Sequence, residues 1–150
     1  MAYNLQTSIP ISFQTGEDLS NNQFQFVRLG PDGLLYGADA TTYPLGVLTN
    51  QPSSAAQGQY AGTVDVVGVT RLAVYGVYPV GTWLVPGIDS TNKGLGMSLA
   101  DASSTNGGVA NNKYIRARVL QASTASYDVI AVQLVDPNPG IDSTTAQGTM

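Results

Sequence analysis

Histidine and cysteine are both absent from this 150-residue chain, and only 11% of its residues are charged. Without an imidazole or a thiol, the chain has no Ser-His-Asp or Cys-His nucleophile, no zinc site of the usual kind and no disulfide. A chain without cysteine folds equally well in reducing and oxidising surroundings, so its composition indicates no compartment. The groups left for chemistry are carboxylates, hydroxyls and lysines. We therefore expect a protein that is not an enzyme and that uses no cofactor and no metal.

Positive charge is also scarce, because six Lys and Arg stand against ten Asp and Glu, a net charge of −4. General affinity for nucleic acid or anionic lipid depends mainly on Lys and Arg. The first residues, Met1 to Asn4, lack the basic start and apolar run of a secretory signal. No stretch approaches the 18 or so apolar residues that span a membrane. We expect neither nucleic acid nor a membrane as a partner.

What the chain does have is a series of short apolar runs with period two, separated by turn residues. The clearest is a hairpin over residues 24–36, in which Gly30-Pro31-Asp32-Gly33 forms the turn. We expect residues 88–112 to be mostly loop. The predicted fold class is all-β, a small β-barrel or sandwich with an extended N-terminal arm and irregular loops. Further strands are expected within residues 45–48, 60–78, 83–85, 114–122 and 127–135.

The organisation predicted along the chain is an N-terminal arm (1–14), a β domain (15–136) and a polar C-terminal tail (137–150). In the arm, apolar side chains alternate with polar ones, and Pro10 lacks a backbone donor, which favours a sheet edge or a place outside the sheet. With unpaired backbone groups, such an arm could add as a strand to another subunit. The candidate binding residues of the arm are Tyr3, Leu5, Ile9, Ile11 and Phe13.

Three patterns resemble catalytic or metal sites, and a solvated loop or connector is the better interpretation of each. Ser90 and Lys93 have the S-x-x-K spacing of some acyl-transfer enzymes, but the S-D-N and K-T-G elements are missing. Asp89 to Gly94 resembles a calcium loop only loosely, because Lys93 occupies a ligand position. The adjacent acids Glu17 and Asp18 point in different directions in any regular structure, so they do not form the pair of facing carboxylates that a glycosidase needs.

A basic cluster lies between Lys113 and Arg118, where three of the six basic residues fall. It fits a solvent-exposed strand face, an ion-pair contact with an acidic partner or neighbouring subunit, or a nucleic-acid platform. Eight tyrosines and one tryptophan suit half-buried positions, protein interfaces or sugar-binding surfaces, and the sequence does not separate these uses. The residues predicted for a possible subunit interface are Tyr43, Trp83, Arg116 and Arg118.

The order of these segments carries a family resemblance. The hairpin over 24–36 precedes Pro44 to Pro52, a valine-rich strand then ends in Gly68-Val69-Thr70-Arg71, and Ala117 to Ala122 leads into Val129 to Leu134. In this order the segments resemble the capsid cement, or head decoration, proteins of tailed bacteriophages. The part from Pro44 to Pro52 is the most specific.

This resemblance implies a non-enzymatic structural protein on the outer surface of the virion capsid, made in the host cytoplasm. Such a protein cements neighbouring subunits of the major capsid protein and often forms a homotrimer. The alternative function is a carbohydrate-binding or adhesin-type β module on a virion surface, for which Tyr and Trp on a β scaffold are the motivation.

Overall fold

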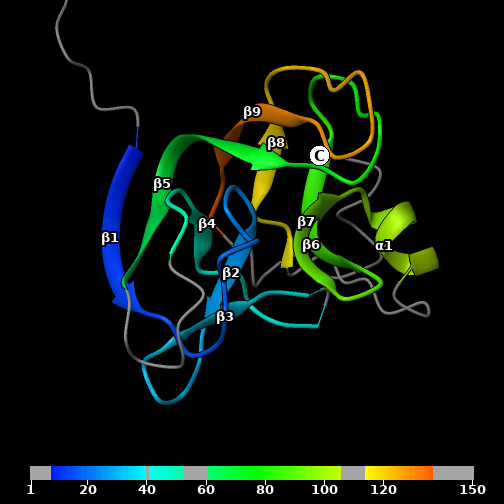
Figure 1. Ribbon diagram of the computed structural model, residues 1–150. Coiled ribbons are helices and arrows are strands. Elements are labelled where there is room, and N and C mark those ends of the chain that lie inside the picture. The colour runs from blue at the N-terminus through cyan, green and yellow to red at the C-terminus, as the bar shows by residue number, and fades with distance from the viewer. Residues whose placement is uncertain (1–7, 40, 53–60, 106–113, 137–150) are drawn as a thin grey trace, which may run out of the picture.

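The computed structural model describes residues 8–39, 41–52, 61–105 and 114–136, which form nine strands and one short helix (Figure 1). No helix among these residues is long and apolar enough to span a membrane. The elements are β1 (Ser8–Gln14), β2 (Phe26–Leu29), β3 (Leu35–Gly37), β4 (Gly46–Leu48), β5 (Ala61–Ala73), β6 (Trp83–Asp89), β7 (Asn92–Met97), α1 (Leu99–Thr105), β8 (Ala117–Val119) and β9 (Val129–Leu134).

The strands form one antiparallel sheet in the order β3-β2-β4-β5-β9-β8-β6-β7, and β1 pairs with β5 beside this path. The sheet curls until its last strand meets the chain that follows β5. There, Tyr75 donates a backbone hydrogen bond of 2.9 Å to Gly96 of β7, next to a bridge between Val74 and Gly96. The predicted all-β small barrel is confirmed.

The predicted hairpin is confirmed as β2 and β3, joined by the turn at Gly30 to Gly33. Gly33 has a φ of +81°, a backbone conformation that glycine adopts without steric cost. The long strand β5 carries a second glycine of this kind, Gly68, with a φ of +102°. At Gly68 the partner of β5 changes from β1 to β9, so the strand serves two parts of the sheet.

The prediction of a loop over residues 88–112 was wrong for its described part, residues 88–105, which contain the end of β6, all of β7 and helix α1. Glycine and asparagine are depleted in strands, so the sequence from Asn92 to Met97 favours a loop. Here the glycines permit close packing. A Cβ on Gly94 would lie 2.3 Å from the Phe26 carbonyl oxygen, and one on Gly96 would lie 2.6 Å from Leu72. Tertiary contact therefore explains a glycine-rich strand.

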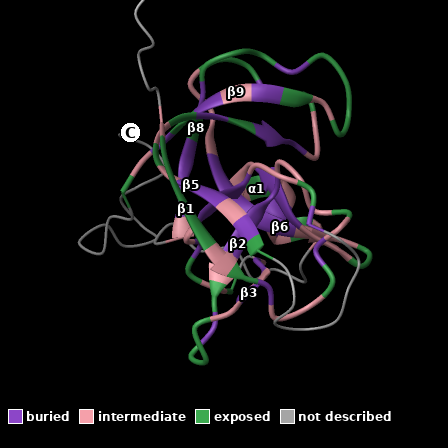
Figure 2. Cartoon of the chain, turned by 60° about the vertical axis from the view of Figure 1, so that its left-hand side comes forward, coloured by how far each residue is buried: buried purple, intermediate pink, exposed green. Residues whose placement is uncertain are grey.

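The interior contains three clusters of buried apolar side chains. Leu72, Ile130 and Val132 belong to the largest, which lies under β5 and β9. Helix α1 contributes Ala102 to the second cluster, which it shares with strands β6 and β7. The third lies near the hairpin and includes Leu35. In Figure 2 buried residues predominate along β6 and β8, whereas strand β1 is largely exposed.

Candidate functional site

The predicted N-terminal arm is a paired strand over its described residues. Residues 8–14 form β1, which pairs with β5, so the expected lack of backbone partners was wrong for this segment. In the described part of the chain β1 has this one partner, which leaves its other side as a sheet edge, as Pro10 indicated. Tyr3 and Leu5 lie outside the described residues. The division into arm, domain and tail stays a prediction.

A bulge in this pairing separates the apolar side chains of β1. Ile9 lies opposite Val67, but the register shifts before Pro10. Phe13 is therefore opposite Gly62, and it packs against the third core cluster. Ile9 and Ile11 are 52% and 45% exposed. Among the described members of the predicted set, Ile9 and Ile11 are therefore exposed to a partner, whereas Phe13 is partly buried.

Two of the predicted interface residues, Trp83 and Arg118, face each other across β6 and β8. The Arg118 guanidinium lies 5.2 Å from the Trp83 ring centre, and the ring also packs against the second core cluster. This is a cation–π contact. A sugar that stacked on Trp83 would have to displace Arg118, so the arrangement gives no support to sugar stacking on Trp83. Tyr43 is 59% exposed on a different segment.

Arg116 was predicted for a possible subunit interface, and a solvent-exposed strand face was one alternative, but its side chain is buried within this chain. Its guanidinium donates to the carbonyl oxygens of Val135 (2.7 Å), Leu45 (3.0 Å) and Val66. These acceptors belong to distant parts of the chain, so Arg116 joins them at one point. Burial lowers the pKa of Arg116, because desolvation penalises its charged form. Only Arg118 of this pair is exposed.

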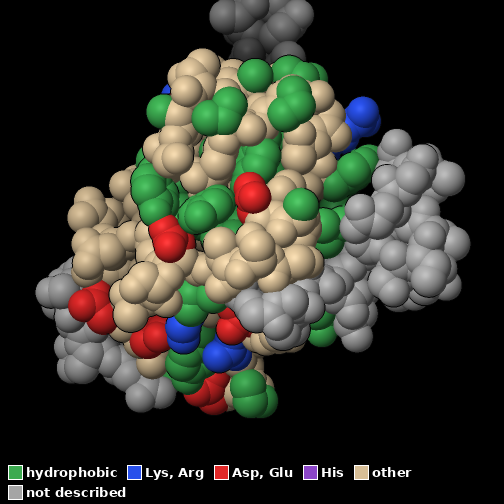
Figure 3. Space-filling view, turned by 90° about the vertical axis from the view of Figure 1, so that its right-hand side faces the viewer, with side chains coloured by type: hydrophobic (Ala, Val, Ile, Leu, Met, Phe, Trp, Pro, Cys, Tyr) green, Lys and Arg blue, Asp and Glu red, His purple; other side chains and the backbone are tan. Residues whose placement is uncertain are grey.

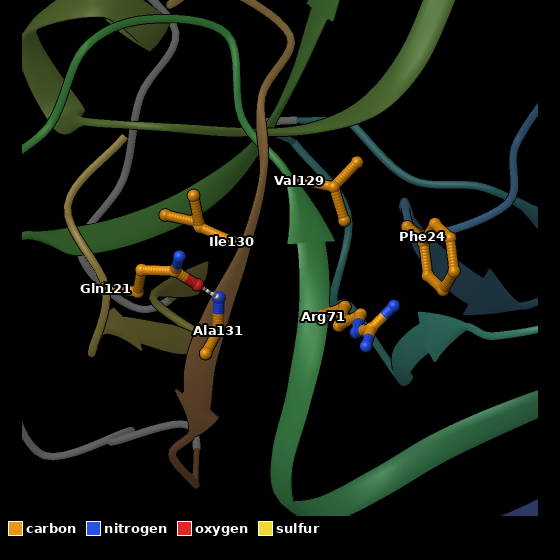
Figure 4. Close-up of a pocket in the computed structure, with 6 residues that line it drawn as sticks. All are labelled: Phe24, Arg71, Gln121, Val129, Ile130 and Ala131. Carbon is orange, nitrogen blue, oxygen red and sulfur yellow. Dashed lines mark hydrogen bonds between the residues drawn. The ribbon is translucent and has the colours of Figure 1, made fainter. Parts of the chain in front are cut away.

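A hollow of about 510 Å³ lies over the end of β5 and β9 (Figure 4). The Arg71 side chain extends towards Phe24, and Gln121 accepts a hydrogen bond of 3.2 Å from the Ala131 backbone. Phe24 has a φ of +64°, in the left-handed region that a bulky residue rarely adopts. No local pattern in the sequence indicates this hollow, because its residues come from segments distant in the sequence. Its lining residues are Phe24, Arg71, Gln121, Val129, Ile130 and Ala131.

The patterns weighed as catalytic or metal sites lie around the β6–β7 turn. Ser90 is exposed in this turn with a φ of +59°, whereas the serine of an S-x-x-K site begins a helix. A small polar hollow of about 100 Å³ includes Glu17, Asp18 and Lys93. Glu17 accepts a hydrogen bond of 2.7 Å from the backbone of Gly37. Among the described residues, no three acidic side chains come together as metal ligands would.

Charge is unevenly spread over the face shown in Figure 3. Most acidic and basic side chains lie in the lower part of this view, with two acidic groups near its centre and a basic group at its upper right edge. Hydrophobic side chains, with uncharged side chains and backbone, cover most of the upper part. The centres of protein interfaces are depleted of charge in the same way. Surface of this kind fits contact with other polypeptides.

No protein-family model matches the chain, and no curated protein matches its sequence. A solved structure that resembles the fold is the head fiber gp8.5 N base in bacteriophage phi29. The TM-score is 0.57 at 11% sequence identity, and the match covers 85% of this chain and 95% of the other. At this identity the likeness shows a shared fold.

Proposed function

We propose that this chain is a structural protein of a bacteriophage head. It binds the outer surface of the shell as a homotrimer, cements neighbouring subunits of the major capsid protein and makes or breaks no covalent bond. The observation that carries the proposal is the fold shared with a phage head fiber base over 85% of the chain. Two independent considerations, the resemblance to cement proteins and the charge-poor surface, favour the same class of function.

Strand β1 supplies the proposed shell contact. Its described outer side is a sheet edge, and Ile9 and Ile11 are about half exposed beside it. Exposed apolar side chains on an edge strand are typical of a docking element, because a partner can cover the side chains and pair with the edge. In a trimer three such contacts act together, and avidity rises by about 10²- to 10⁴-fold when all can engage.

The test mixes the purified full chain with purified heads that lack it and measures cosedimentation. We expect Ile9→Ser with Ile11→Ser to abolish binding, and Leu29→Ser with Val77→Ser to bind as the wild type does. The control pair is also exposed, at 42% and 64%, and lies outside β1. Substitution is preferable to deletion of residues 1–14, because deletion would remove a paired strand.

The outcomes separate the parts of the proposal. If the wild-type chain does not bind heads, or if imaging finds it inside the head, the proposed function is wrong. If the Ile9/Ile11 variant binds normally, the role of β1 is wrong. Sedimentation equilibrium of the free protein tests the trimer, which requires three times the mass of one chain.

A further inference from the structure

Strands β5 and β9 are apolar on both of their faces. The inward side chains Leu72, Ile130 and Val132 are buried in the core. The outward side also carries exposed valines. An antiparallel sheet with one face in water ordinarily alternates apolar and polar residues, whereas apolar residues on both faces are typical of strands covered on both sides. The exposed side chains of this outer face are Val67 (49%), Val69 (37%) and Val129 (41%), with Ile9 (52%) opposite Val67.

The same outer face continues across the neighbouring strands. Val69 pairs with Gln133, Gln133 with Arg118, and Arg118 with Trp83, so one residue from each of β5, β9, β8 and β6 lies in a row. Directly opposite residues in antiparallel strands project from the same face. Arg71 is two residues beyond Val69 and lines the hollow of about 510 Å³. We call this surface the arginine face. It consists of the row Val69, Gln133, Arg118 and Trp83 and of the residues that line the hollow.

The arginine face has two exposed cations, Arg71 and Arg118, and neither has a carboxylate partner within the described part of the chain. Of the acids along β5 and β9, Asp65 accepts a hydrogen bond from Thr70, and Asp128 accepts one from Thr124. Asp136, beyond the end of β9, interacts electrostatically with the buried Arg116. The arginines are two strand spacings and two residues apart, with β9 between their strands, which corresponds to about 12 Å between their Cα atoms. The face is therefore apolar with two separated positive charges.

We propose that the arginine face docks on an acidic protein surface, one that presents carboxylates among apolar side chains. The valines gain from burial, and each guanidinium forms a fork that fits a carboxylate. Under the proposed function, on which this inference rests, the partner is a shell subunit. A symmetric contact between two copies of this chain fits poorly, because it brings arginine against arginine.

The test compares two variants that change the net charge equally. Arg71→Gln with Arg118→Gln removes the cations of the arginine face, and Arg28→Gln with Lys93→Gln removes two cations elsewhere. We expect the first pair to weaken binding to purified heads at least tenfold and to reduce its salt dependence. The control pair stays within about twofold of the wild type, because general electrostatics change alike in both. Thermal melts confirm that both variants are folded.

The absence of cysteine permits a second measurement on the full chain, because an introduced thiol is the only one it has. Gln133→Cys places it in the middle of the arginine face, and Thr91→Cys places it at the exposed β6–β7 turn. We expect binding to heads to slow alkylation of the first thiol at least tenfold and to leave the second unchanged. Mass spectrometry of this chain measures both rates.

The possible outcomes distinguish docking of the arginine face on a shell subunit from its alternatives. The inference is overturned if the arginine variant binds like the control while the wild type binds heads, or if Gln133→Cys stays reactive on the particle. Loss of self-association in the arginine variant would identify a second copy as the occupant and overturn the shell partner. Tight binding of single-stranded DNA at this face would likewise exclude it. Wild-type protein that binds no heads refutes the proposed function itself.

Discussion

The Tyr78 hydroxyl donates a hydrogen bond of 2.5 Å to Oδ2 of Asp101, which joins the loop after β5 to helix α1. The same loop is held on its other side by Ser123, whose hydroxyl accepts from the Tyr78 backbone at 2.7 Å and donates to Gly76 at 2.8 Å. Tyr78 is 6% exposed. One tyrosine thus connects the helix, the loop and the segment before β9.

This contact predicts a measurable loss of stability. Tyr78→Phe keeps the ring but leaves the Asp101 carboxylate without its phenol donor, and we expect a cost of about 1–2 kcal/mol in the free energy of unfolding. Urea denaturation measures it. Tyr43→Phe is the control, since Tyr43 is largely exposed, and should change stability by less than about 0.5 kcal/mol. Equal values for the two variants would contradict the role given to the bond.

The same residue predicts a dependence on alkaline pH. Burial, and then the hydrogen bond to Asp101, raise the pKa of Tyr78 above its ordinary value. A group whose pKa is raised by folding stabilises the protein below its unfolded pKa of about 10, and this stability is lost as the pH rises towards the folded pKa. Tyr78→Phe lacks the ionisable group. The stability difference between wild type and variant should therefore be constant from pH 8 to 9 and shrink above pH 10, as urea titrations will show. A stability difference that increased above pH 10 would contradict a raised pKa of Tyr78 in the folded protein.

Arg116 predicts a larger cost than its exposed neighbour. Arg116→Met leaves the carbonyl oxygens of Val135, Leu45 and Val66 without this donor, and we expect a loss of at least about 3 kcal/mol. Arg118→Met removes only the contact with the indole ring, for which about 0.5–1 kcal/mol is expected. Chemical denaturation of both variants gives the comparison. A small effect at Arg116 would mean that the three bonds contribute little.

Two glycines with positive φ predict opposite tolerance to a methyl group. At Gly94 an added Cβ would lie 2.3 Å from the Phe26 carbonyl oxygen, so Gly94→Ala should disrupt the contact between β7 and β2 and cost at least about 3 kcal/mol. At Gly33 nothing lies within 4 Å of the added Cβ, so Gly33→Ala should cost only the backbone term, about 1 kcal/mol. Thermal or urea unfolding distinguishes them. Equal losses of stability in the two variants would show that the positive φ, and not the close approach to Phe26, sets the cost of the added methyl group.

Local pattern allowed much of the fold to be predicted. The hairpin was predictable because proline and glycine specify its turn, and β4, β5 and β9 because valine, isoleucine and leucine recur there. Strand β7 was missed, because the contacts that make its glycines useful come from Phe26 and Leu72, far away in the sequence. In the candidate site, Ile9, Ile11 and Arg118 are exposed, and their role in binding stays a prediction; the bulge in β1 did not follow from any local signal.

By itself, the sequence determined the all-β class, the scarcity of charge and the lack of imidazole and thiol chemistry, because these depend on composition and on the period of the side chains. Only the tertiary structure decided which side chains face outward. It buried Arg116 and left Arg118 exposed, although they are two residues apart. It also brought Arg71, Val69, Gln133 and Trp83 onto one face. The physical reason is that strand register and barrel closure set these neighbours, and both depend on pairing between residues distant in the chain.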